Sequence, residues 1–201
     1  MATEAAKPAV ETVDSDVPRR ADAVRNRERV IEAAAEVFAE QGIDAGVPEV
    51  AERAGVGKGT VYRNFETKDD LVAAVLAMRQ ADFTAAVQRA LEQEDAWQAF
   101  RELLLDTVRG KMRTSKLVLG LRAFDQHEPL KAERAKSLGY LDQLMQKAIK
   151  QGTMREDAKP EDVSVLFGGV CRLLNERGEQ DPKVWRRHTD QVVDAFRVQP
   201  S

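Results

Sequence analysis

Two short amphipathic segments joined by a glycine turn, at residues 47–68, constrain the fold more than any other part of this chain. In each segment the apolar side chains fall on one helical face: Val50, Ala51 and Ala54 in the first, Val61 and Phe65 in the second. Gly55 follows the first segment, where a left-handed conformation is usual and glycine adopts it without a Cβ penalty. The pattern predicts two short helices, each with one side to bury, on either side of a tight turn.

The outer side of the second predicted helix carries residues suited to nucleic acid. With Val61 and Phe65 facing inward, the residues left outside are Lys58, Gly59, Thr60, Tyr62, Arg63 and Asn64. Arginine can bridge guanine O6 and N7, asparagine can pair with adenine, a threonine methyl can touch thymine, and lysine and hydroxyls hold phosphates. Glycine weakens a helix, so Gly59 indicates a close approach of the backbone to the duplex. We therefore predict that this helix enters the DNA major groove.

These segments resemble the helix-turn-helix of the TetR family of transcriptional regulators. The matching residues are Ala51, Ala54-Gly55-Val56 and Gly59-Thr60-Val61-Tyr62-Arg63-Asn64-Phe65, followed by Lys68 and an apolar helix from Leu71. The resemblance extends from Arg27 to Leu76, and the remainder matches in length and helical pattern. One departure is Gly46-Val47, where the family often has a capping threonine. A side-chain cap and a hydroxyl contact to phosphate are therefore not expected there.

Helical periodicity continues through the rest of the chain, and no segment alternates with period two for long enough to form a strand. We predict an all-α fold of about nine helices. Outside the helix-turn-helix, the predicted helices cover about residues 22–41, 68–93, 95–110, 116–124, 130–150, 160–174 and 182–198. The predicted divisions are a disordered tail at 1–18, a helix-turn-helix domain at 19–68 and a helical ligand-binding and dimerisation domain at 69–201.

The charge distribution indicates weak general attraction to DNA. The net charge is −3, the predicted tail has one lysine against four acids, and residues 19–68 have nine groups of each sign. The basic clusters are Arg19 and Arg20, Arg25 and Arg27, and Lys58, Arg63 and Lys68, while Glu28, Glu32, Glu36 and Glu40 form a separate row expected to face away from phosphates. Arg19 and Arg20 are candidates for a minor-groove arm or for a solvated basic patch. Binding should depend on geometry and direct base contacts.

Composition narrows the class of protein further. The chain has 201 residues, 43% of them hydrophobic, with no apolar run long enough for a membrane span and no secretory signal, so we expect a cytoplasmic protein. Cys171, the one cysteine, is expected to pack in the core. No nucleophile elbow, P-loop or zinc motif is present, and His127 lacks a helical partner, so no enzyme activity, metal or cofactor is expected.

The second half of the chain is predicted to hold two copies together. A protein that reads a single half-site binds DNA weakly, and helix-turn-helix proteins usually dimerise to read two half-sites. The candidate interface residues lie on the last two helices: Val163, Phe167, Val170 and Leu174, with Trp185 and Val193. The resemblance implies a four-helix interface across two chains. The alternative is that the same stripe is internal core.

The resemblance also implies a ligand pocket, because regulators of this family generally respond to a small molecule. The candidate lining residues are Trp97, Phe100, Leu104, Leu117, Leu121, Phe124, Leu141 and Met145, which also suit plain core. The resemblance implies a ligand-responsive repressor that binds a palindromic operator as a homodimer, released when the ligand shifts the helix from Leu71 to Gln93. The alternative is a constitutive dimeric DNA-binding protein without an effector.

Overall fold

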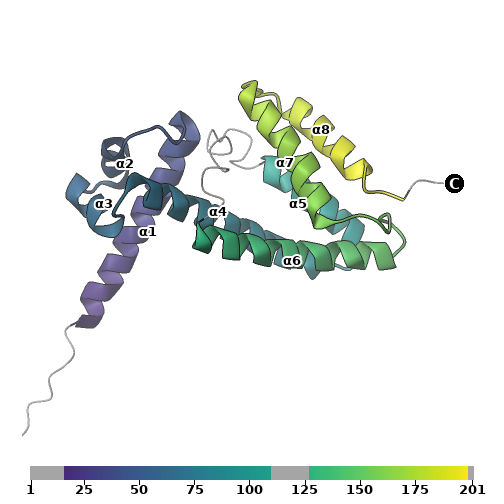
Figure 1. The fold of residues 1–201 in the computed structure, drawn as a ribbon, viewed down its shortest axis with the longest axis horizontal. Helices are drawn as coiled ribbons and strands as arrows, with labels where there is room; N and C mark the ends of the chain where they lie inside the picture. Colours follow the sequence, from purple (N-terminus) through teal and green to yellow (C-terminus); the bar gives the residue numbers. More distant parts are fainter. Residues whose placement is uncertain (1–15, 110–126, 199–201) are drawn as a thin grey trace, which may run out of the picture.

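A computed structural model describes residues 16–109 and 127–198 as eight α-helices (Figure 1). They are α1 (Asp16–Gln41), α2 (Val47–Ala54), α3 (Lys58–Asn64), α4 (Lys68–Leu91), α5 (Ala96–Arg109), α6 (Glu128–Lys150), α7 (Pro160–Glu176) and α8 (Pro182–Asp194). Within these ranges the β-type pairing is one isolated bridge between Met154 and Arg197. The all-α prediction is confirmed, with a helix count close to the one expected. The helix predicted at 116–124 lies outside the described residues.

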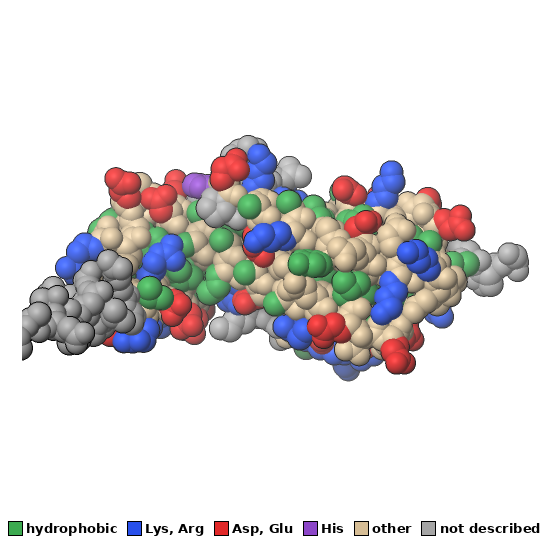
Figure 2. All heavy atoms as spheres, turned by 90° about the horizontal axis from the view of Figure 1, so that it is seen from below, with side chains coloured by type: hydrophobic (Ala, Val, Ile, Leu, Met, Phe, Trp, Pro, Cys, Tyr) green, Lys and Arg blue, Asp and Glu red, His purple; other side chains and the backbone are tan. Residues whose placement is uncertain are grey.

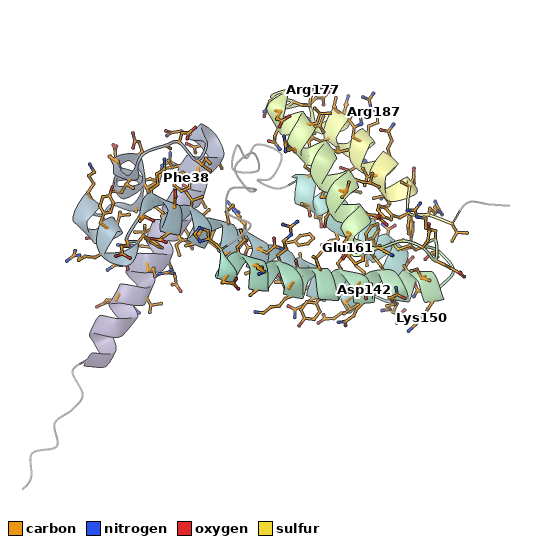
Figure 3. All side chains as sticks on the ribbon, viewed as in Figure 1. Phe38, Asp142, Lys150, Glu161, Arg177 and Arg187 are labelled. Carbon is orange, nitrogen blue, oxygen red and sulfur yellow. The ribbon has the colours of Figure 1, made fainter. Side chains whose placement is uncertain are left out.

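The helix-turn-helix belongs to a compact N-terminal bundle, formed by α1, α2, α3 and the first turns of α4. Its core consists of buried apolar side chains, among them Val30, Ala34, Phe38, Val50, Val61, Phe65, Leu71 and Val75. Phe38 points from α1 into this bundle (Figure 3). Burial of these side chains from four helices holds α3 in place, because seven residues alone are too short for a stable helix.

The ends of the helices follow local chemistry. Gly55 ends α2 with φ of 66°, which confirms the left-handed turn predicted from the sequence. Thr67 begins α4 in a capping box: its Oγ1 accepts from the Asp70 amide at 3.1 Å, while the Thr67 amide donates to Asp70 Oδ2 at 2.9 Å. Gly46 precedes α2 without a side-chain cap, as expected.

The first helix begins earlier than predicted. We expected it to start near residue 22, but α1 extends back to Asp16 and so includes residues 16–18 of the predicted tail. Arg19 and Arg20 therefore lie within α1. Alanine and arginine favour helix even without an apolar stripe, and hydrophobic periodicity does not detect a helical segment that lacks one.

The C-terminal body is formed by α5, α7, α8 and the remaining parts of α4 and α6. Its core includes Val87, Phe100, Leu104, Leu144, Met145, Phe167, Trp185 and Phe196. The Phe100 and Phe196 rings meet edge to face, with centroids 5.7 Å apart. No helix in the described ranges has the length and apolar character that a membrane span needs.

Helices α4 and α6 run side by side and connect the bundle to the body (Figure 1). At the bundle end, Leu130 of α6 is 5% exposed and belongs to the bundle core. In the middle, Gln80 Nε2 donates to Ser137 Oγ at 2.6 Å. At the far end, Lys147 Nζ donates to the carbonyl of Leu91, the last residue of α4, at 3.3 Å, and to the Gln93 carbonyl just beyond it at 2.5 Å. The two helices are thus joined at both ends and between them.

Candidate DNA-binding surface

Helix α3 presents its polar side chains to solvent. Val61 and Phe65 are 1% and 4% exposed, so the inward face predicted from the sequence is confirmed. Lys58, Gly59, Tyr62 and Arg63 are exposed, and Thr60 and Asn64 are half-buried. The six candidate residues on α3 therefore share one outer surface.

Hydrogen bonds within α3 orient three of these side chains. Arg63 Nη2 donates to Thr60 Oγ1 at 2.8 Å, and Asn64 Nδ2 donates to the Thr60 carbonyl at 2.8 Å. The first contact lays the guanidinium along the outer face of α3. The second uses one of the two amide hydrogens of Asn64 and leaves its carbonyl oxygen open. Thr60 consequently acts more as a support for its neighbours than as a free hydroxyl.

Lys68, the remaining candidate on the helix-turn-helix, is half-buried at the first position of α4. The capping box fixes the backbone there. Donation from the Thr67 hydroxyl and amide stabilises the charged carboxylate of Asp70 and holds its pKa below the ordinary value. The position of Lys68 relative to α3 is therefore set by the same turn that starts α4.

The acidic row on α1 is partly neutralised from within the bundle. Arg53 of α2 donates to Glu40 at 2.9 Å and to Glu36 at 3.2 Å. The hydrogen bond and the charge of Arg53 lower the pKa of Glu40, and the two carboxylates raise the pKa of Arg53. Acidic and basic side chains are also interspersed over the face seen in Figure 2. The charge that Arg53 carries is thus directed toward α1 rather than toward a duplex.

The candidate pocket residues within the described ranges lie in the core of the body. Trp97, Phe100, Leu104, Leu141 and Met145 are all at most 8% exposed. Leu117, Leu121 and Phe124 lie outside the described residues. An open groove does exist between α6 and the segment before α7, lined in part by Leu138, Asp142 and Glu161, the last two labelled in Figure 3. None of the predicted lining residues contributes to that groove.

The candidate dimerisation residues also face inward. Val163, Phe167, Leu174, Trp185 and Val193 are buried in the core of the body, and Val170 is half-buried. The apolar side chains that α7 exposes are Val165 at 71%, Leu166 at 41% and Leu173 at 46%. The sequence pattern did not single out these three. We name Val165, Leu166 and Leu173 the outer face of α7.

Known proteins share both the motif and the whole architecture. Residues 30–75 match the family model "Bacterial regulatory proteins, tetR family". The HTH-type transcriptional regulator SrpR of Pseudomonas putida is 32% identical over 163 residues, which span 78% of this chain and 76% of that protein. The crystal structure of a TetR transcription regulatory protein from Mycobacterium vanbaalenii has 32% identity and a TM-score of 0.63, and the match covers 90% of this chain and all of that one.

A second solved structure, the TetR transcriptional regulator SCO0520 from Streptomyces coelicolor, has 27% identity and a TM-score of 0.66, covering 87% of this chain and 99% of that chain. A helical body behind an exposed helix-turn-helix defines a DNA-binding transcriptional regulator. The chain belongs to the TetR family.

Proposed function

We propose that this protein is a cytoplasmic homodimeric repressor that reads a palindromic operator through α3 and is released from it by a small molecule. The observation that carries the proposal is the division of α3 into a buried face, Val61 and Phe65, and an outer face of DNA-binding types. Arg63 and Asn64 are the proposed base readers, and Lys58, Tyr62 and Lys68 the proposed phosphate contacts. Gly59 would let the backbone approach the duplex.

A dimer is proposed because two copies of α3 are needed to read two half-sites about 34–36 Å apart. The outer face of α7 supports this, since a second copy of the chain would cover Val165, Leu166 and Leu173 from solvent. A two-fold axis would place the same patch on both sides of such an interface. Phe167 and Leu174 would then support the interface from the core rather than touch the partner.

A small molecule would act through α6 as well as α4. The contacts of Leu130, Gln80 and Lys147 join the two helices, so a ligand that displaces α6 also displaces α4 and the bundle. A coupling free energy of about 1–3 kcal/mol would change operator affinity about 5–150-fold.

The second candidate function is a constitutive dimeric DNA-binding protein without an effector. Phe100, Leu104 and Met145 have no exposed surface and pack in the core of the body. Among the described residues of the predicted pocket, this burial favours a protein without an effector. A screen of metabolites for release of bound operator distinguishes the two. Release by a compound at a defined stoichiometry would support the sensor.

The test of DNA recognition begins with selection of bound sites from random duplexes. Arg63→Ala should then lose about 1–3 kcal/mol of discrimination at particular operator positions. Lys68→Ala should weaken binding to all sequences alike and flatten the salt dependence by about one unit for each subunit bound. Equal losses on operator and random DNA for Arg63→Ala would refute its role in base reading.

A further inference from the structure

Arg27 of α1 has an exposed guanidinium placed over an aromatic ring. Its Cζ lies 4.9 Å from the centroid of the Phe65 ring, and Phe65 is the residue that ends α3. Phe65 is itself 4% exposed and fixed in the bundle core. A guanidinium held over an immobile ring loses part of its freedom before any ligand binds, and because Arg27 is exposed its N–H groups can still reach a ligand in solvent.

The contacts of Arg27 differ from those of the other described arginines in the bundle. Arg25 pairs with Asp22, Arg29 donates to Asn26, Arg53 binds Glu36 and Glu40, and Arg63 donates to Thr60. Arg27 instead contacts the face of a phenyl ring. Phenylalanine has no oxygen or nitrogen to accept a hydrogen bond from the guanidinium N–H groups. Its full charge and its hydrogen-bonding edge therefore remain available to an anion.

The location of Arg27 indicates which anion its guanidinium would bind. Phe65 directly follows Asn64 and precedes Lys68 by three positions, so the stacked guanidinium lies where α3 meets α4, between two candidate DNA contacts. The bundle as a whole carries no excess positive charge. A single oriented cation at this junction therefore contributes a larger share of the attraction to a phosphate than it would on a basic surface.

We propose that Arg27 binds a backbone phosphate of the operator and thereby fixes the position of the duplex along α3. The planar guanidinium suits two parallel hydrogen bonds to phosphate oxygens, and the contact with the Phe65 ring keeps its charge beside the end of α3. This assignment rests on the proposed DNA binding by α3 and adds a contact from α1 to it.

The experiment measures binding of the full-length protein to a selected operator and to a random duplex over a series of salt concentrations. Arg27→Gln should reduce the slope of log Kobs against log salt by about 0.9 for each subunit bound, about 1.8 for a dimer that loses two contacts, with equal fold losses on both duplexes. Arg27→Lys should keep the slope and still bind more weakly than wild type, because lysine keeps the charge without the planar fork. Arg53→Gln, which removes the same charge from a side chain already bound to two carboxylates, is the matched control and should keep the wild-type slope.

The outcomes separate this inference from the proposed function. Wild type that selects no site from random duplexes would overturn the proposed function itself. Wild type that binds its operator while Arg27→Gln keeps the same slope as Arg53→Gln would overturn the role of Arg27 alone. Arg27→Lys with wild-type affinity would overturn the role of the planar fork. Matching circular dichroism spectra confirm that the variants compared are equally folded.

Discussion

Gly59 stands at the second position of α3, and a Cβ built there would meet no atom within 4 Å outside its own stretch of helix. Alanine at this position should raise stability by up to about 1 kcal/mol, because glycine is the poorer helix former. We expect Gly59→Ala to raise the thermal midpoint and yet weaken operator binding, since the methyl group would stand between α3 and the duplex. Thermal unfolding and fluorescence anisotropy with labelled operator measure the two effects.

A matched control for this change lies in the body. Gly139 of α6 is also exposed, and a Cβ there would likewise meet nothing within 4 Å. Gly139→Ala should gain stability and keep operator affinity. Unchanged affinity in Gly59→Ala would contradict the proposed close approach of the backbone.

Cys171 is 2% exposed on α7, and burial raises the pKa of its thiol from 9.0 to about 12. We expect the native protein to react slowly with a thiol reagent at neutral pH, because the reactive form is the thiolate. The unfolded chain releases this proton near pH 9 and the native state does not, so the contribution to stability is lost as pH rises from about 9 to about 12. Thiol titration in buffer and in denaturant checks this, and rapid reaction of the folded protein would contradict it.

The positions of the α3 side chains could be predicted from sequence, because Val61 and Phe65 mark the buried face and fix where the neighbouring residues point. The stacking of Arg27 on Phe65 could not be predicted in this way. The two residues come from different helices, and helical periodicity does not specify which surfaces of two helices meet. The same limit applies to the pairing of Arg53 with Glu36 and Glu40.

At the scale of the helices, the ends were predictable where a cap specifies them. Thr67 caps α4, and Asp95 Oδ1 accepts from the Gln98 amide at 2.9 Å before α5; threonine and aspartate are both favoured at helix N-termini. The inward face of α7 could also be predicted, because its apolar residues form a stripe at helical spacing. The sequence could not show whether that stripe packs inside the chain or against a second copy, because both give the same period. The candidate interface residues Phe167 and Leu174 are buried in the core of the body within one copy of the chain, and α7 exposes a different face.

Leu130 should matter more than its place in the C-terminal half suggests. It comes from α6 but is buried in the core of the N-terminal bundle. We expect Leu130→Ala to lower the free energy of unfolding by about 2–5 kcal/mol, because a buried leucine is replaced by a cavity. It should also weaken operator binding by loosening the bundle from α6. Denaturant titration and operator binding measure both.

Leu138, two turns further along α6, is half-buried beside the open groove and gives the control. Leu138→Ala should cost clearly less stability and leave operator binding unchanged. Equal losses for the two variants would contradict the assignment of Leu130 to the bundle core.

At the scale of the whole molecule, the outer face of α7 predicts the oligomeric state. Leu173 is 46% exposed, and in the proposed dimer it contacts the second copy. Leu173→Arg should halve the mass found by sedimentation equilibrium and reduce operator affinity strongly, because an unpaired charge would be buried at the interface. Val198→Arg is the control, since Val198 is 44% exposed outside this face and its substitution should leave the mass unchanged. A monomeric wild type would refute the interface.

The pairing of Arg53 with Glu36 and Glu40 affects how much of the protein in a cell is bound to nonspecific DNA. A genome offers about 10⁶–10⁹ competing sites, and a strongly basic regulator would spend most of its time bound to them. A bundle with no net positive charge, in which Arg53 is already paired with two carboxylates, leaves more molecules unbound at any moment. We therefore expect a small number of copies to be enough to keep an operator occupied, with rapid exchange between chromosome and solution.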